Sequence, residues 1–207
     1  MEKTLNFSEP FLNAEYVSEV EKYPVQDKTI VINIGQQPVE IEGFRLYPMK
    51  SSLFSNTIIP RGESLILISV AKEDFLGQEI KIDEEIIKNT WHHVYDFYNL
   101  PHLKKTPLWH SEKETIGNIL LNLWYAPKGT LCGLHHEHSF REVHTQIFGI
   151  GSMQKFHEND PKSIYQEVIM SPGYTHDPFY SKKGTYPWHQ YYAATDCIWL
   201  AIEIHEI

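Results

Sequence analysis

Short runs of apolar and β-branched residues alternate with turn-forming residues along most of the chain. In the first third these runs include TIVINI (29–34), VEIEGFRLYPM (39–49) and ESLILISV (63–70). β-Branched and aromatic side chains pack well on a pleated sheet, and the Gly, Pro and Asn residues between the runs favour turns. The pattern therefore predicts many short strands.

One longer segment breaks this β pattern. From Asp83 to Leu100, apolar residues recur at helical spacing, Asp83 is a candidate N-cap, and Pro101 follows the end. The polar residues 14–22 also fit a short helix. We therefore expect a short helical segment added to a β protein.

Strand patterns resume in the second half of the chain. The clearest runs are TIGNILLNLWYAP (115–127), REVHTQIF (141–148), SMQKF (152–156) and DCIWLAIEIHEI (196–207). Many short strands with Gly and Pro turns are typical of an all-β sandwich or barrel. The expected fold class is therefore all-β.

Charge and composition exclude some classes of partner. The 27 acidic and 18 basic residues give a net charge of -9, and no Lys/Arg-rich run is present, so no nucleic-acid partner is expected. No stretch has the roughly 20 apolar residues of a membrane span, and the N-terminus lacks the apolar core of a signal peptide. We expect a cytoplasmic protein without a membrane partner, with Cys132 and Cys197 as free thiols.

Residues 133–149, GLHHEHSFREVHTQIFG, place four histidines and two acids in one expected hairpin. Side chains alternate between the faces of a strand, so His136 and His138 should point the same way. A tight turn at 139–141 would return Glu142 to their side. Two imidazoles and a carboxylate suit Fe(II), Mn, Ni, Zn or Cu, so we expect one divalent metal ion per chain.

Two further polar residues follow on the same expected face. His144 and Gln146 share the strand parity of Glu142. His144 fits a base, an additional ligand or a residue that orients a ligand, and Gln146 fits a contact with substrate or with a ligand. Both are candidate catalytic residues.

The spacing in this stretch resembles the first motif of the cupin superfamily. Gly129 is followed by six residues, His136-x-His138, three residues, Glu142, six residues and Gly149. The family pattern has five residues in the first gap, and the other spacings fit it. The resemblance implies that His136, His138 and Glu142 are metal ligands.

The resemblance covers residues 111–207 and implies a double-stranded β-helix, the cupin jelly roll, as the barrel core. Residues 1–110 would then be an N-terminal segment of extra strands and a helix that packs on the barrel. Cupins commonly dimerise through such additions, so the resemblance also implies a homodimer.

The second cupin motif supplies one more histidine, and two candidates exist. Pro187 lies two residues before His189, and a long apolar strand follows, as in the family. His176 keeps the family's spacing from Gly173. The resemblance favours His189 as the fourth ligand and leaves His176 open.

A cupin binds its substrate at the barrel mouth. The candidate pocket residues are aromatic or polar and lie near the predicted ligands: Asn122, Trp124, His176, Trp188 and Tyr191.

We interpret the chain as a metal-dependent cupin enzyme. The first hypothesis is a mononuclear Fe(II) dioxygenase or oxidase that acts on a small organic substrate. The alternatives are a redox-neutral isomerase or lyase that uses Zn, Mn or Ni, and a non-catalytic cupin that binds a small molecule. The sequence has no signature for a particular substrate.

Overall fold

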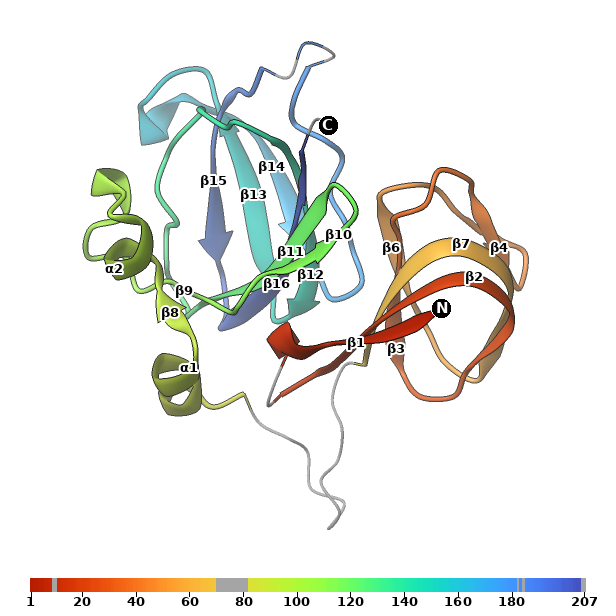
Figure 1. Cartoon of the computed structure of the whole chain (residues 1–207). Helices are drawn as coiled ribbons and strands as arrows, with labels where there is room; N and C mark the ends of the chain where they lie inside the picture. Colours follow the sequence, from red (N-terminus) through yellow and green to blue (C-terminus); the bar gives the residue numbers. More distant parts are fainter. Residues whose placement is uncertain (9–10, 70–81, 182, 184, 206–207) are drawn as a thin grey trace. The chain divides into compact units, whose positions relative to one another are not determined.

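The computed structural model describes residues 1–8, 11–69, 82–181, 183 and 185–205 (Figure 1). These residues form two compact units. The N-terminal unit comprises Met1–Ile82 and Pro172–Thr175, and the C-terminal unit comprises Asp83–Ser171 and His176–Ile207.

The division lies at 82/83, whereas the expected boundary was at 110/111. The reason is that β9 (Trp109–His110) pairs with β11 (Ile119–Ala126) and is therefore part of the C-terminal sheet.

The N-terminal unit is an antiparallel sheet with strand order β1-β2-β7-β3-β6, accompanied by the pair β4–β5. Figure 1 shows β2 and β7 curving together along their length. The strands are β1 (Glu2–Leu5), β2 (Asn13–Val25), β3 (Thr29–Asn33), β4 (Val39–Ile41), β5 (Phe44–Leu46), β6 (Lys50–Phe54) and β7 (Thr57–Ser69).

The helix expected over residues 14–22 is wrong, because this stretch lies within β2 and pairs with β7. The backbone has positive φ at Glu19 (50°) and Lys22 (54°), which interrupts the two-residue alternation of the strand. Val17 and Val20 are consequently both buried although they are three residues apart. That spacing resembles helical periodicity.

A short piece of the second half of the chain completes the N-terminal unit. Ser51 of β6 donates a hydrogen bond of 2.8 Å to the carbonyl oxygen of Gly173, and its hydroxyl lies 2.6 Å from that of Thr175. Gly173 has a φ of +87°, which favours glycine. Pro172–Thr175 is therefore held by β6 rather than by its neighbours in sequence.

The C-terminal unit has two antiparallel sheets, one with order β12-β16-β11-β9-β8 plus β10 on β11, the other with order β14-β13-β15. Met153, Tyr191 and Trp199 from the two sheets share one apolar core. The expected all-β class is confirmed. The remaining strands are β8 (His92–His93), β10 (Glu114–Ile116), β12 (Arg141–Phe148), β13 (Gly151–Phe156), β14 (Ile164–Met170), β15 (Trp188–Ala193) and β16 (Cys197–Ile204).

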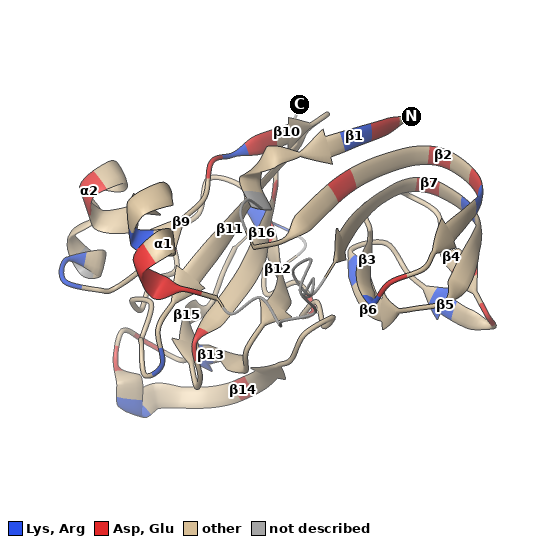
Figure 2. Cartoon of the chain, turned by 90° about the horizontal axis from the view of Figure 1, so that it is seen from below, with Lys and Arg blue, Asp and Glu red and all other residues tan. Residues whose placement is uncertain are grey.

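The helical segment is split in two, α1 (Glu84–Thr90) and α2 (Val94–Tyr98). Asp83 caps α1 as expected, accepting hydrogen bonds from two backbone N–H groups. The helix ends at Trp91 because the next two residues form β8 and pair with β9. Figure 2 shows acids in the first turn of α1 and a base in its last, the order that complements the helix dipole. Within the described residues no helix is both long and apolar enough to cross a membrane.

Candidate metal centre

The segment before β12 is irregular rather than a strand. From Leu131 to Phe140 the chain has only single β-bridges, at Leu131 and at His135. His135 and His189 exchange two backbone hydrogen bonds, of 3.1 and 2.9 Å. These bonds fix one residue of the histidine-rich segment directly beside β15.

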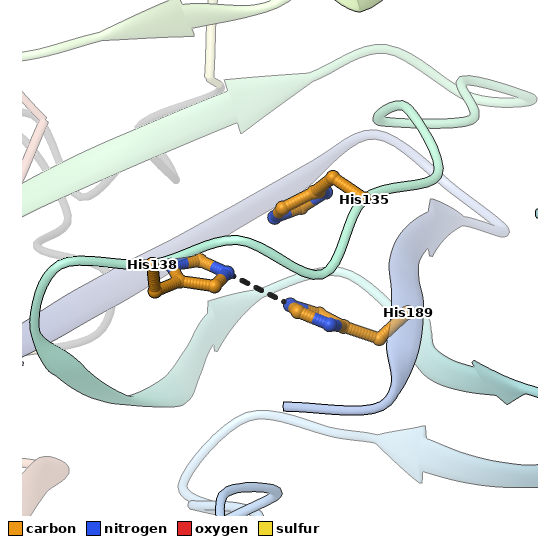
Figure 3. Close-up of side chains that lie close together, drawn as sticks. All are labelled: His135, His138 and His189. Atoms are coloured by element: carbon orange, nitrogen blue, oxygen red, sulfur yellow. Dashed lines mark hydrogen bonds between the residues drawn. The ribbon is translucent and has the colours of Figure 1, made fainter. Parts of the chain in front are cut away.

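Three imidazoles converge at this point (Figure 3). One ring nitrogen each from His135, His138 and His189 lies within 4.8 Å of the others. The Nε2 atoms of His138 and His189 are 3.1 Å apart. Two nitrogens that each bind one ion at about 2.1 Å lie roughly 3–3.4 Å from each other. The His138–His189 pair therefore has the spacing of two ligands of one ion, and His135 lies within 4.8 Å of both.

The backbone fixes the tautomers of two of these rings. The Nδ1–H of His135 donates to the carbonyl oxygen of Gly133, and that of His189 donates to the carbonyl oxygen of Pro187, both at 2.9 Å. Since a carbonyl oxygen only accepts, each Nδ1 carries the proton and each Nε2 keeps its lone pair. Such partners orient metal-binding histidines.

Burial also keeps the cluster uncharged. It lowers the pKa of His189 to about 3 and that of His138 to about 4, and it lowers the pKa of His135. Neutral imidazoles are the form that binds metal. These residues therefore fit a divalent ion.

His136, an expected ligand, lies outside this cluster. Its ring packs against Trp188 with centroids 4.1 Å apart. The expectation assumed strand alternation through residues 136–138, but this segment is irregular, so His135 and His138 reach the cluster instead. A signal for His135 was present, because it restores the family's five-residue gap after Gly129.

Glu142, also an expected ligand, lies next to the cluster. One carboxylate oxygen is 3.0 Å from Nε2 of His144, and the other is 3.8 Å from Nδ1 of His138. Burial raises the pKa of Glu142, but His144 and His138 oppose this more strongly, and the pKa is lowered to about 2. Tyr186 accepts a hydrogen bond of 2.7 Å from the Glu142 backbone N–H. An ionised carboxylate is therefore fixed between two imidazoles.

His144 presents a lone pair next to this carboxylate. Because Glu142 accepts the hydrogen bond from Nε2, the neutral form of His144 carries its proton on Nε2 and has its lone pair on Nδ1. Nδ1 is buried and has no hydrogen-bond partner within the described part of the chain. His144 can therefore accept a proton at Nδ1.

His176, the open alternative for the fourth ligand, has both ring nitrogens occupied. Its Nε2 accepts the backbone N–H of His144 at 2.9 Å, and its Nδ1 donates to the carbonyl oxygen of Asp177 at 2.7 Å. His189 is the candidate that the structure brings to the cluster.

Gln146, the second candidate catalytic residue, is fully buried by neighbours. Its amide nitrogen donates to Phe148 O at 2.7 Å, and its Oε1 accepts from the Tyr191 hydroxyl at 2.6 Å. Gly151 leaves the space for that hydroxyl, since an added Cβ would collide with it. These contacts give Gln146 a role in positioning Tyr191.

A cavity of about 320 Å³ adjoins the three histidines. Of the candidate pocket residues, Trp124 and Tyr191 line it, whereas Asn122, His176 and Trp188 do not. Sequence reasoning missed several lining residues, because they come from α2, the segment before β10, and β16: Tyr98, Lys113, Trp199 and Glu203.

The positions of the motif residues decide the fold type. His135 and His138 precede β12, Glu142 lies at its start, and Gly149 lies in the turn to the second sheet. His189 comes from β15 in that second sheet and completes the cluster. The C-terminal unit has a cupin fold.

Comparison with known proteins adds little to the assignment of this cupin unit. No protein-family model and no curated protein matches the chain. Similar solved structures include a cupin superfamily protein from Desulfitobacterium hafniense, with 10% identity over 48% of this chain and 78% of that chain, and a TM-score of 0.36. Ectoine synthase from P. lautus has 13% identity over 62% and 79%, with a TM-score of 0.40.

A cupin 2 conserved barrel domain protein from Leptotrichia buccalis has 9% identity over 99% of this chain and 88% of that chain, with a TM-score of 0.36. Likenesses this weak say nothing about activity. The cupin fold is assigned on the chain's own motif and strand arrangement.

Proposed function

We propose that the cupin unit is a mononuclear metal-dependent enzyme, with Fe(II) as its ion and a small organic molecule as the substrate that it oxidises with O₂. The observation that carries the proposal is the convergence of three imidazoles, which burial keeps neutral, at a cavity. His135, His138 and His189 would hold the ion. Three protein ligands leave further positions for substrate and O₂.

A bound divalent ion supplies Lewis acidity, and Fe(II) supplies the electrons that O₂ activation requires. The chain's own residues supply binding and proton handling. Three neutral ligands leave the charge of the ion uncompensated within its own ligand set, so the ion would polarise a substrate group that it binds. Because the cavity is largely apolar and aromatic, it keeps water away from the reacting atoms.

We assign proton transfer to His144. Its Nδ1 takes a proton from the substrate, and the carboxylate of Glu142 stabilises the imidazolium that forms. The hydrogen bond to Nε2 keeps the ring in the tautomer that this step needs. His144 is therefore placed in the catalytic machinery and the three clustered histidines in metal binding.

Metal analysis of protein purified without a His tag tests the ligand set. Wild type and His136→Ala are expected to hold one ion per chain, whereas His135→Ala, His138→Ala and His189→Ala lose it. His136 is a matched control, because it adjoins His135 in sequence and lies outside the cluster. Loss of metal in His136→Ala with retention in His135→Ala would contradict the ligand set.

Oxygen consumption tests the reaction type. The Fe(II)-loaded protein is expected to consume O₂ only when a substrate is present, and His144→Ala should lose this activity while keeping its metal. Turnover without O₂ in the Zn-, Mn- or Ni-loaded protein would replace the proposal with redox-neutral chemistry. Stoichiometric ligand binding without turnover by any metal form would replace it with a binding role.

A further inference from the structure

The cavity has a charged part that the proposed reaction does not use. Lys113, in the segment before β10, and Glu203, on β16, both line it. Nζ of Lys113 lies 3.3 Å from Oε1 of Glu203. The Glu203 side chain is 6% exposed and that of Lys113 is 33% exposed, so the lysine side chain remains partly accessible.

The hydrogen-bonding capacity of this pair is unequal. Oε1 of Glu203 accepts from Lys113, and its Oε2 lies 3.3 Å from Nε2 of His205, so both carboxylate oxygens have partners. An ammonium group has three donors. One is directed to Glu203, and a second is used by Tyr98, whose ring centre lies 5.4 Å from Nζ. One donor of Lys113 therefore remains for a ligand, and only an acceptor can use it.

The charge balance of the loaded cavity favours an anion. Lys113 is the one Lys or Arg among the described lining residues, and Glu142 and Glu203 are the lining carboxylates that are shielded from solvent. Glu137 also lines the cavity but is exposed, so water screens its charge. With a divalent ion on three neutral histidines, the enclosed charges leave an excess of one positive charge. A ligand with a single negative charge neutralises it.

The walls of the cavity favour a flat apolar body on that ligand. The rings of Tyr191 and Trp199 are stacked with centroids 4.0 Å apart and planes at 24°. Trp124 continues this row at 6.3 Å from Trp199 and 15°. Aromatic rings that line a cavity bury a hydrocarbon or aromatic group well, and about 320 Å³ is at the small end of ligand pockets.

We propose that Lys113 is a specificity-determining residue that binds the carboxylate of a small, apolar-bodied monocarboxylic acid. The body of the acid lies along the Trp124–Trp199–Tyr191 row, with its other end toward the three histidines. The proposal deepens the proposed function, because it names the substrate class for that site. Recognition by Lys113 is nevertheless separable from metal binding.

Calorimetric binding to the Zn(II)-loaded protein tests the proposal with three probes of one skeleton: phenylacetate, 2-phenylacetamide and 2-phenylethylamine. Phenylacetate is expected to bind at least about tenfold more tightly than the amide, because a charge-assisted hydrogen bond contributes that much or more. The amine should bind most weakly. Lys113→Met should remove the acid-over-amide preference, and Lys162→Met, an exposed lysine outside the cavity, should keep it.

Two further variants separate the possible outcomes. Because Lys113→Met leaves Glu203 buried without its lysine, Lys113→Met/Glu203→Gln removes both charges and is expected to lose the same preference while holding one Zn per chain. A preference that survives in this double variant overturns the proposal, since the carboxylate is then bound by the metal. Tighter binding of the amine by wild type also overturns it. Loss of Zn from wild type would instead contradict the proposed function alone.

Discussion

The hydrogen bond between His144 and Glu142 orients the imidazole for proton transfer only when the Glu142 carboxylate is ionised. The carboxylate accepts the Nε2–H of His144 at 3.0 Å, so in the neutral ring the lone pair is on Nδ1, which is buried. An amide in place of the carboxylate has no charge and presents either an oxygen or an NH₂ group. The pair therefore depends on the ionised form of Glu142 more than on its shape.

Glu142→Gln should lower turnover of the Fe(II) protein by about 10²-fold or more, because the variant no longer stabilises the imidazolium of His144. Metal content should stay near one ion per chain. ¹⁵N NMR of the ring checks the cause directly, since wild type should show the proton on Nε2. Unchanged turnover, or metal loss in Glu142→Gln, would show that Glu142 acts differently.

His110 is a buried imidazole outside the histidine cluster. Its Nδ1–H donates to the carbonyl oxygen of Ser111 at 2.8 Å, and its ring packs against Tyr98 and Trp124. Burial lowers its pKa more than the Ser111 contact raises it. The imidazole of His110 therefore takes up a second proton, which would make it cationic, less readily in the folded state than in the unfolded state.

The sign of the resulting pH dependence follows from linkage. Above the pKa of about 6.5 that His110 has in the unfolded state, its protonation does not reduce the free energy of unfolding. As pH falls from there through the lower pKa of the folded state, the free energy of unfolding decreases. His110→Phe should accordingly show a smaller drop in urea midpoint between pH 7 and pH 5 than wild type. His157→Phe, on the surface, is the control and should match wild type. An equal drop in both variants contradicts the prediction.

At the residue scale the sequence indicated the segments in which the three-histidine cluster lies, but not which of two adjacent histidines belongs to it. The spacing of Gly129, Glu142 and Gly149 and the layout around His189 pointed to the segments that contribute His138 and His189 to the cluster. The choice between His135 and His136 depended on whether the segment alternates like a strand. Backbone bonds between His135 and His189, 54 residues on, decide that, and such pairing is not visible in local sequence.

Among the elements, the turn from β12 to β13 carries the chain from one sheet of the C-terminal unit to the other. Gly149 in this turn has a φ of +73°, and an added Cβ would collide with the carbonyl oxygen of Asp196. Gly129 has a similar φ of +85° with no atom within 4 Å of an added Cβ. Both glycines thus have a left-handed backbone, and only Gly149 is also crowded by neighbouring atoms.

Gly129→Ala should cost about 1–2 kcal/mol of unfolding free energy, the cost of left-handed backbone for an L-residue. Gly149→Ala adds the collision with Asp196 and should cost on the order of 3 kcal/mol or more. Urea denaturation of both variants measures the difference. Equal losses would show that the turn relaxes around the new side chain.

Element types were easier to predict than element ends. Alternating apolar runs gave most strands of both units, and Asp83 gave the start of α1. The prediction of one continuous helix is wrong at Trp91. His92 and His93 pair with β9 as a strand, although the apolar spacing around them is helical. The helix predicted for residues 14–22 is wrong because positive φ at two residues changes which positions of β2 are buried, so that the spacing resembles that of a helix.

For the whole molecule, the tryptophans are unevenly placed. All five lie in the C-terminal unit: Trp91, Trp109, Trp124, Trp188 and Trp199. Tryptophan fluorescence therefore reports on the cupin unit alone.

The division of the chain into two units at 82/83 could not be predicted from composition. The strand β9 is only two residues long, and its partner strand lies further along the chain.

Metal binding should raise the stability seen by this fluorescence. Free Zn(II) at 100 times its Kd should add about 2.7 kcal/mol to the unfolding free energy of the cupin unit, because the ion binds the folded site. The increase should be present in His136→Ala and absent in His189→Ala. A similar increase in His189→Ala would show that the ion binds elsewhere.

The place of Pro172–Thr175 has a consequence for biosynthesis. The strands of the N-terminal unit have all left the ribosome once residue 69 is clear of it, and N-terminal domains generally begin to fold while translation continues. Ser51 must nevertheless wait more than a hundred residues for Gly173 and Thr175. By then β12 and β13 have also emerged, so these last contacts of the N-terminal unit form only after much of the C-terminal unit has been synthesised.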